Sequence, residues 1–130
     1  MTQEEKNLLI KYLCAALPYG LMMGNKEWPR KPYQLTCDEV QYAMMEDDWD
    51  DVPFLRPISS MTKEEYECIT PMLGERRVTY KANGGFELNK IKTCSLELIG
   101  WLLAHHFDFR GLIDKGLAIE VTDKNNPYKD

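Results

Sequence analysis

The first segment of the chain has apolar residues at helical spacing. Its apolar positions, three or four residues apart, are Leu9, Leu13, Ala16 and Leu17, with Tyr12 beside them. Thr2 stands three residues before Glu5, which is the spacing of a capping box. Pro18 ends a helix, because the residue before a proline is kept out of the α region. We therefore predict a helix over about residues 2–16.

The next segment, residues 19–57, has short apolar stretches between glycine, asparagine, proline and acidic residues. Four of these stretches have the length of a strand, at residues 20–23, 33–37, 40–45 and 52–55. Because no helix is predicted between them, they favour a small antiparallel meander. Proline cannot donate to a ladder, so strand edges or loops are expected at Pro29, Pro32 and Pro53.

The second half of the chain returns to helical spacing. Thr62 and Glu65 form another capping-box pair before an apolar face, and Pro71 makes the predicted helix short or irregular. Residues 77–81 and 86–89 then flank an Ala-Asn-Gly-Gly turn, which predicts a hairpin. A third helix starts after Thr93 or Ser95, and a closing strand is predicted at residues 117–121.

These elements predict an α+β protein with a small antiparallel sheet and about three helices. A chain of 130 residues has the size of one domain, and 44% hydrophobic with 28% charged residues is an ordinary globular composition. We assign residues 1–122 to a single compact domain. Residues 123–130 are expected to form a polar tail without fixed structure.

Charge and cysteine content narrow the function classes. A net charge of −5 repels nucleic acid and anionic membranes, so a nucleic-acid partner is disfavoured and no membrane partner is expected. The apolar runs fall short of the roughly 20 residues that span a bilayer, and acids occupy the place of a signal's basic region. The expected location is the cytoplasm.

The four cysteines form no CxxC pair, and we expect free thiols that are buried or half-buried. The alternative is that one of them is a reactive nucleophile.

Three blocks of the sequence resemble a group of short proteins encoded in gut bacteria and their phages. The blocks are LPYG at residues 17–20, FLRPISSMT at residues 54–62 and HHFDFRGLI at residues 105–113. The resemblance implies a setting of prophages and mobile elements and a compact α+β domain. It transfers no catalytic residue. The proline-rich and acidic residues 28–51 depart from the pattern of that group.

Side chains capable of chemistry are concentrated in residues 95–121. His105 and His106 are adjacent, and Asp108 follows two residues later, so two imidazoles and a carboxylate lie close together. An acid–base or metal site is one hypothesis for this cluster. Neighbouring helical residues point about 100° apart, however, which is unfavourable for sharing one ion within a helix.

A structural interpretation accounts for the same residues. Both histidines are expected in the last turn of the helix, where an imidazole can bond unpaired carbonyls. Asp108 is expected to cap a short turn that ends at Gly116, and Arg110 to form a fork-shaped pair with a carboxylate. Both interpretations stay open at this point. The catalytic candidates are His105, His106, Asp108 and Arg110.

The acidic run at residues 46–51 is the second conspicuous segment. Its sixth position is Asp51, where an EF-hand loop requires glycine, and its flanks have the pattern of strands, so an EF-hand is disfavoured. A solvated turn, a weak divalent-cation site and an acidic protein-contact loop remain as alternatives. Burial is expected for Trp28 and Trp49, whereas their exposure would form an apolar contact patch. The candidates for a binding surface are Trp28, Trp49, Asp48, Asp50 and Phe54.

Motifs for nucleotide or serine-nucleophile chemistry are missing from the sequence. It contains no P-loop, no GxGxxG and no GxSxG, so we assign no cofactor and no resident metal. The main hypothesis is a non-enzymatic accessory domain that binds another protein. The alternative is a small metal-dependent or acid–base hydrolase built on the histidine cluster. A nucleic-acid binder or mimic ranks third.

Overall fold

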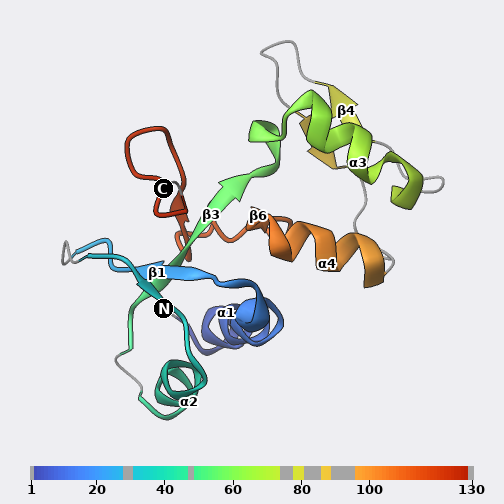
Figure 1. Cartoon of the computed structure of the whole chain (residues 1–130). Helices are drawn as coiled ribbons and strands as arrows, with labels where there is room; N and C mark the ends of the chain where they lie inside the picture. The colour runs from blue at the N-terminus through green and yellow to red at the C-terminus, as the bar shows by residue number, and fades with distance from the viewer. Residues whose placement is uncertain are drawn as a thin grey trace.

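The computed structural model describes residues 2–27, 31–46, 49–73, 78–80, 86–88 and 96–128. Within these ranges four α-helices accompany a five-stranded mixed sheet and a separate two-stranded hairpin. Figure 1 shows β3 (Val52–Pro57) running through the middle of the molecule, with α1 and α2 toward one end and α3 toward the other. The predicted α+β class is confirmed.

Helix α1 (Gln3–Ala16) begins as the sequence predicted. The Thr2 hydroxyl accepts from the Glu5 N–H at 3.1 Å, and the Glu5 carboxylate accepts from the Thr2 N–H at 2.9 Å. The helix passes into a 3₁₀ turn at Leu17–Tyr19, which contains Pro18. Gly20 then reverses the chain with a φ of +71°, a conformation that glycine adopts without strain. This turn leads directly into β1 (Met22–Gly24).

Strand β3 is the hub of the main sheet. It pairs antiparallel with β1, which in turn pairs antiparallel with β2 (Tyr33–Gln34). Further along, β3 pairs in parallel with β7 (Ile119–Glu120) and then with β6 (Phe107–Asp108). The sequence predicted an antiparallel meander and did not predict these parallel pairings. They join segments that are more than fifty residues apart in the chain, which local patterns do not encode.

Pro53 lies inside the central strand, where an edge or a loop was predicted. It pairs with Met23 of β1, and β7 becomes the partner of β3 at the next residue, Phe54. Proline has no N–H to donate to a neighbouring strand. Few hydrogen bonds of the sheet are therefore lost at this position, where the pairing of β3 changes. Pro29 lies outside the described residues.

Residues 40–45 were predicted as a strand and instead belong to helix α2 (Cys37–Met45). Thr36 caps this helix by accepting from the Glu39 N–H, and acidic residues in the first turn favour the positive end of its dipole. Only Val40 and Ala43 are buried, one turn apart. The pattern misled because the other apolar residues of this segment point to solvent.

Helix α3 (Lys63–Leu73) starts at the predicted second capping box, with the reciprocal Thr62 and Glu65 bonds at 3.0 and 3.2 Å. Strands β4 (Val78–Tyr80) and β5 (Phe86–Leu88) pair antiparallel, which confirms the hairpin. Its predicted turn and the predicted stop at Gly74 lie outside the described residues. So do the predicted caps of α4 (Leu96–Ala104), Thr93 and Ser95.

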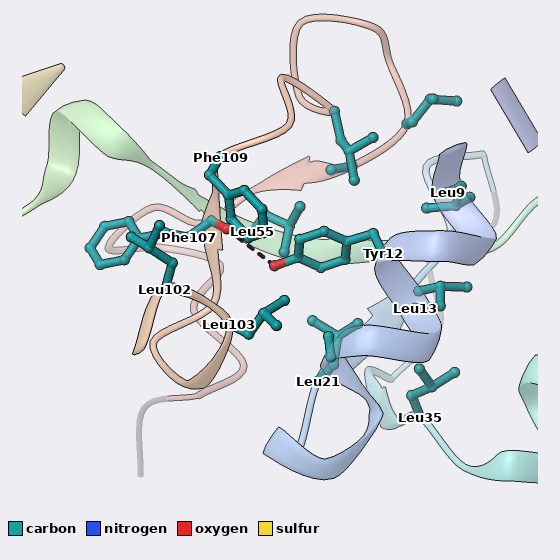
Figure 2. Close-up of a cluster of buried hydrophobic side chains, with 14 of the residues drawn as sticks. Leu9, Tyr12, Leu13, Leu21, Leu35, Leu55, Leu102, Leu103, Phe107 and Phe109 are labelled. Atoms are coloured by element: carbon teal, nitrogen blue, oxygen red, sulfur yellow. Dashed lines mark hydrogen bonds between the residues drawn. The ribbon is translucent and has the colours of Figure 1, made fainter. Parts of the chain in front are cut away.

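The main core lies between α1, the sheet and α4. Figure 2 shows the Tyr12 side chain reaching across it, with its hydroxyl donating to the Phe107 carbonyl at 3.1 Å. Burial raises the pKa of Tyr12 strongly, so this hydroxyl stays a neutral donor. The buried residues around it are Leu9, Leu13, Leu21, Leu35, Leu55, Leu102, Leu103, Phe107 and Phe109.

None of the helices in the described ranges has the length and apolar character of a membrane span.

Candidate functional site

The two histidines end helix α4 in different ways. The His105 Nδ1 lies 2.9 Å from the Trp101 carbonyl, and its ring stacks on the Trp101 indole at 3.9 Å. The predicted bond from an imidazole to a carbonyl at the helix end is thus present for His105, although that carbonyl is not unpaired, because it also accepts from the His105 N–H at 3.1 Å. For His106 the prediction was wrong, because its buried Nδ1 bonds no carbonyl of the described residues. His106 takes the left-handed conformation that ends the helix, with a φ of +60°, and its N–H donates to the Leu103 carbonyl at 3.1 Å.

The His106 ring packs against the C-terminal segment. It stacks on Tyr128 with 3.8 Å between ring centroids and 7° between planes. Its Nδ1 is buried and has no hydrogen-bond partner among the described residues. Burial lowers the pKa of His106 to about 4, and the charges of His105 and Arg56 act in the same direction. At neutral pH this imidazole is therefore uncharged.

Asp108 carries out the structural role predicted for it. Its two carboxylate oxygens accept from the N–H groups of Leu112 and Ile113 at 2.8 and 2.9 Å. The turn closes at Gly116, whose N–H donates to the Ile113 carbonyl and whose φ is +75°. Both oxygens of Asp108 are thus engaged with the backbone of the next turn.

The fork-shaped arginine pair forms at a different arginine from the predicted one. Arg110 is exposed, and its guanidinium carbon lies 5.3 Å from the Phe109 ring centroid. Arg56 makes the bidentate pair instead, with bonds of 2.7 and 2.8 Å to Glu65, and its guanidinium covers the Phe107 ring at 4.1 Å. This pair fixes α3 against the end of β3. Arg110 was the arginine predicted from the sequence. The packing of β3 against α3 places Arg56 beside Glu65 instead.

The C-terminal segment was expected to lack fixed structure, but Tyr128 holds it against the sheet. The Tyr128 hydroxyl donates to the Phe54 carbonyl at 2.7 Å and accepts from the Met22 N–H at 3.0 Å. Burial raises the pKa of Tyr128 above its usual range, so the hydroxyl keeps its proton. The Asn125 side-chain amide also donates to the Glu120 carbonyl on β7, at 3.0 Å. The polar sequence of this segment did not indicate these contacts.

A cavity of about 400 Å³ lies between this segment, the end of α4 and β3. The structure brings His105 and His106 to it but does not bring Asp108. Other polar side chains in its wall are Arg56, Ser60, Asp123 and Tyr128. Within the described ranges there is no group of three histidine, cysteine, aspartate or glutamate side chains arranged to hold a metal ion.

The acidic run is partly tied into the fold. Asp51 is buried and accepts from the Tyr33 hydroxyl at 2.6 Å and from the Asn25 side-chain amide at 3.0 Å. Asp50 is exposed and accepts from the same amide. The Glu46 carbonyl accepts from the Lys6 ammonium at 2.7 Å, which joins the end of α2 to α1.

Those predicted binding residues that the structure describes do not gather into an exposed apolar patch. Phe54 is only 8% exposed, and Trp49 is half-buried against the core. Trp28 and Asp48 lie outside the described residues. Among the predicted residues that the structure describes, only Asp50 is fully on the surface.

Most of the exposed large apolar side chains of the described residues lie instead on the neighbouring helix, α2, the other being Tyr19 in the turn after α1. Tyr42 is 61% exposed, Met44 53% and Met45 80%. The sequence analysis missed these residues because it placed them in a half-buried strand. A signal was present: Thr36 followed by two acids is a helix start, and helical spacing from Val40 buries Ala43 and turns Tyr42 and Met45 outward.

For the described cysteines, the prediction of free thiols is confirmed and the prediction of their burial was wrong. Cys14, Cys37 and Cys68 are all free and exposed, and Cys94 lies outside the described residues. Each lies on a helix, where only the face turned to the core is buried. Cys14 follows the buried residue Leu13 but points away from it, since successive helical residues differ by about 100°.

Comparison with known proteins places no further constraint on function. No protein-family model, curated protein or solved structure matches this chain. Two regions therefore compete as the functional site. One is the exposed face of α2, and the other is the cavity beside His106.

Proposed function

We propose that this chain is a protein-binding domain that contacts its partner through the solvent face of α2. One observation carries the proposal: a helix of nine residues exposes Tyr42, Met44 and Met45 while burying only two side chains. Single exposed apolar residues are ordinary, but an adjacent pair such as Tyr42 and Met45 on one short helix, with Met44 exposed as well, is typical of a contact surface.

The positions of these side chains suit a contact. Tyr42 and Met45 are three residues apart and therefore neighbours on the helix surface, and they point away from the side that buries Val40 and Ala43. Burying a methionine side chain contributes about 1.5–3 kcal/mol, which the free protein forgoes at each exposed position. Methionine adapts its shape to a partner, and tyrosine is common at the energetic centres of interfaces.

The histidine cavity gives less support to the alternative, a small hydrolase. His106 is a weak base at neutral pH because its pKa is about 4, and both Asp108 oxygens already bind backbone N–H groups. The His105 ring is held by its bond to the Trp101 carbonyl. These contacts account for the cluster as architecture of the α4 terminus.

The biological setting of the proposed domain is an accessory protein of a prophage or other mobile element. The support is the resemblance of the three sequence blocks. In the structure these blocks form the turn after α1, the passage from β3 into α3 and the capped corner after α4. They shape the scaffold, and α2 lies outside them.

Site-specific photo-crosslinking tests the proposed function. A benzoyl-phenylalanine replaces Tyr42 in the full chain, and the protein is irradiated in extract of the cells that produce it. We expect one dominant crosslinked protein, because the probe sits at the centre of the contact. The control carries the same probe at Lys124, an exposed position on the C-terminal segment.

Competition makes the result specific to the α2 surface. Excess unlabelled wild-type protein should suppress the crosslink, whereas excess of the variant combining Tyr42→Ser and Met45→Ser should not. Circular dichroism checks that this variant is folded. Equal crosslinking from positions 42 and 124, or equal competition by both proteins, refutes the proposed function.

A further inference from the structure

We infer that the partner presents a basic amphipathic helix to α2. This inference rests on the proposed function and adds the chemistry of the partner. The partner helix would place apolar residues at positions i, i+3, i+4 and i+7 against Tyr42 and Met45, with lysine or arginine residues on its flanks.

The charge around α2 has one sign. Every charged residue between positions 33 and 55 is acidic. Asp38 and Glu46 are exposed in the structure, one turn before Tyr42 and directly after Met45. The nearby Lys6 ammonium is buried, and its hydrogen bond goes to the Glu46 carbonyl. An acidic border around an apolar centre favours a partner with cationic flanks.

The C-terminal end of α2 adds to this preference through the Glu46 side chain. The end of the helix dipole already meets a cation, because the Lys6 ammonium binds the Glu46 carbonyl at 2.7 Å. Met45, the most exposed of the apolar residues, is the final residue of the helix, and the exposed Glu46 follows it. A cation placed beside Met45 would therefore meet the Glu46 carboxylate.

A second copy of this chain fits the surface poorly. Self-association through α2 would bring two acidic borders together, each on a chain of net charge −5. Such like charges repel within the Debye length, about 8 Å at physiological ionic strength. A helix is the fitting shape because the exposed row on α2 is convex and two helices pack closely at 8–10 Å between axes.

Two synthetic peptides of the same length test the inference. Both carry leucine at i, i+3, i+4 and i+7, and their flanks carry lysine in one peptide and glutamate in the other. Isothermal titration measures affinity for the full chain, and amide chemical shifts locate the contact. We expect the lysine peptide to bind at α2, at least ten-fold more tightly than the glutamate peptide, and more weakly as salt is raised.

A charge-neutralising pair of variants sharpens this test. Glu46→Gln should weaken binding of the lysine peptide about two- to five-fold, the range of a surface ion pair. Glu120→Gln, which makes the same change at an exposed position on β7, should leave the affinity unchanged.

The outcomes separate the two proposals. If both peptides bind equally at α2 and Met45→Ser abolishes binding, the apolar contact stands and the basic partner is refuted. If neither peptide binds, or if the shifts map away from α2, both the inference and the proposed contact surface are overturned. Dimerisation through α2 in sedimentation analysis would also overturn the basic partner.

Discussion

Gly24 lies where β1, β3 and β7 meet, and replacing it with alanine should destabilise the fold. A Cβ at this position would lie 2.6 Å from Phe54 Cε2, 3.0 Å from Cζ of the same ring and 3.3 Å from Ile119 Cδ1. Normal carbon contacts are about 3.5–4.0 Å, so the ring would have to move by about 1 Å. Phe54 is buried, and its backbone pairs with Ile119 of β7, so the ring has little room to move.

The expected loss for Gly24→Ala is about 1–3 kcal/mol in the free energy of unfolding, the usual cost of overpacking. Gly100→Ala is the matched control. Gly100 lies within α4, and the nearest atom to its added Cβ would be the Tyr19 hydroxyl at an ordinary 3.5 Å. Alanine is the better helix former by about 0.5–1 kcal/mol, so this variant should be neutral or stabilised.

Urea unfolding followed by circular dichroism measures both variants. The two glycine substitutions should change stability in opposite directions. A double-mutant cycle with Phe54→Leu tests the cause, because a smaller side chain at position 54 should remove part of the penalty of alanine at position 24. If Gly24→Ala is as stable as wild type, or if Phe54→Leu leaves its penalty unchanged, the close packing between β1 and β3 is refuted.

Two further predictions concern Tyr128 and the His106 ring that stacks on it. Tyr128→Phe should lower the free energy of unfolding by about 1–3 kcal/mol in urea titrations, because it leaves backbone groups of β1 and β3 without their partner; unchanged stability would contradict the bridge. His106 should make the protein less stable as pH falls from about 6.5 to about 4, because the unfolded chain takes up its proton first. The shift in pKa would give about 3 kcal/mol for a fully buried ring, and about 1–2 kcal/mol after solvent screening of its exposed part. His106→Asn should remove this part of the pH dependence, and an unaltered profile would contradict the prediction.

The histidine cluster shows how far the sequence could identify a site. Adjacent histidines beside an aspartate were recognisable as residue types, and the capping role of Asp108 followed from its position before a turn. The stacking of His106 on Tyr128 joins residues far apart in the chain. Burial lowers the pKa of His106, and no local pattern contains the contact with Tyr128.

The sequence by itself determined the elements whose cause is local. The capping boxes at Thr2 and Thr62 and the hairpin of β4 and β5 follow from hydrogen bonds or pairing over short chain separations. Helix α2 was also encoded locally, by Thr36 and its acidic first turn, but its exposed methionines resembled a half-buried strand. A hydrophobicity pattern assumes that apolar side chains are buried, and it fails where they face solvent, as in α2.

Only the tertiary structure decided which segments pair with β3, which arginine binds Glu65 and which apolar residues face solvent. These features depend on contacts between distant segments, so they arise only when the core closes. The sequence supplies an acidic stretch around an apolar one. In the fold, Asp51 is buried, whereas Tyr42 and Met45 are exposed to solvent.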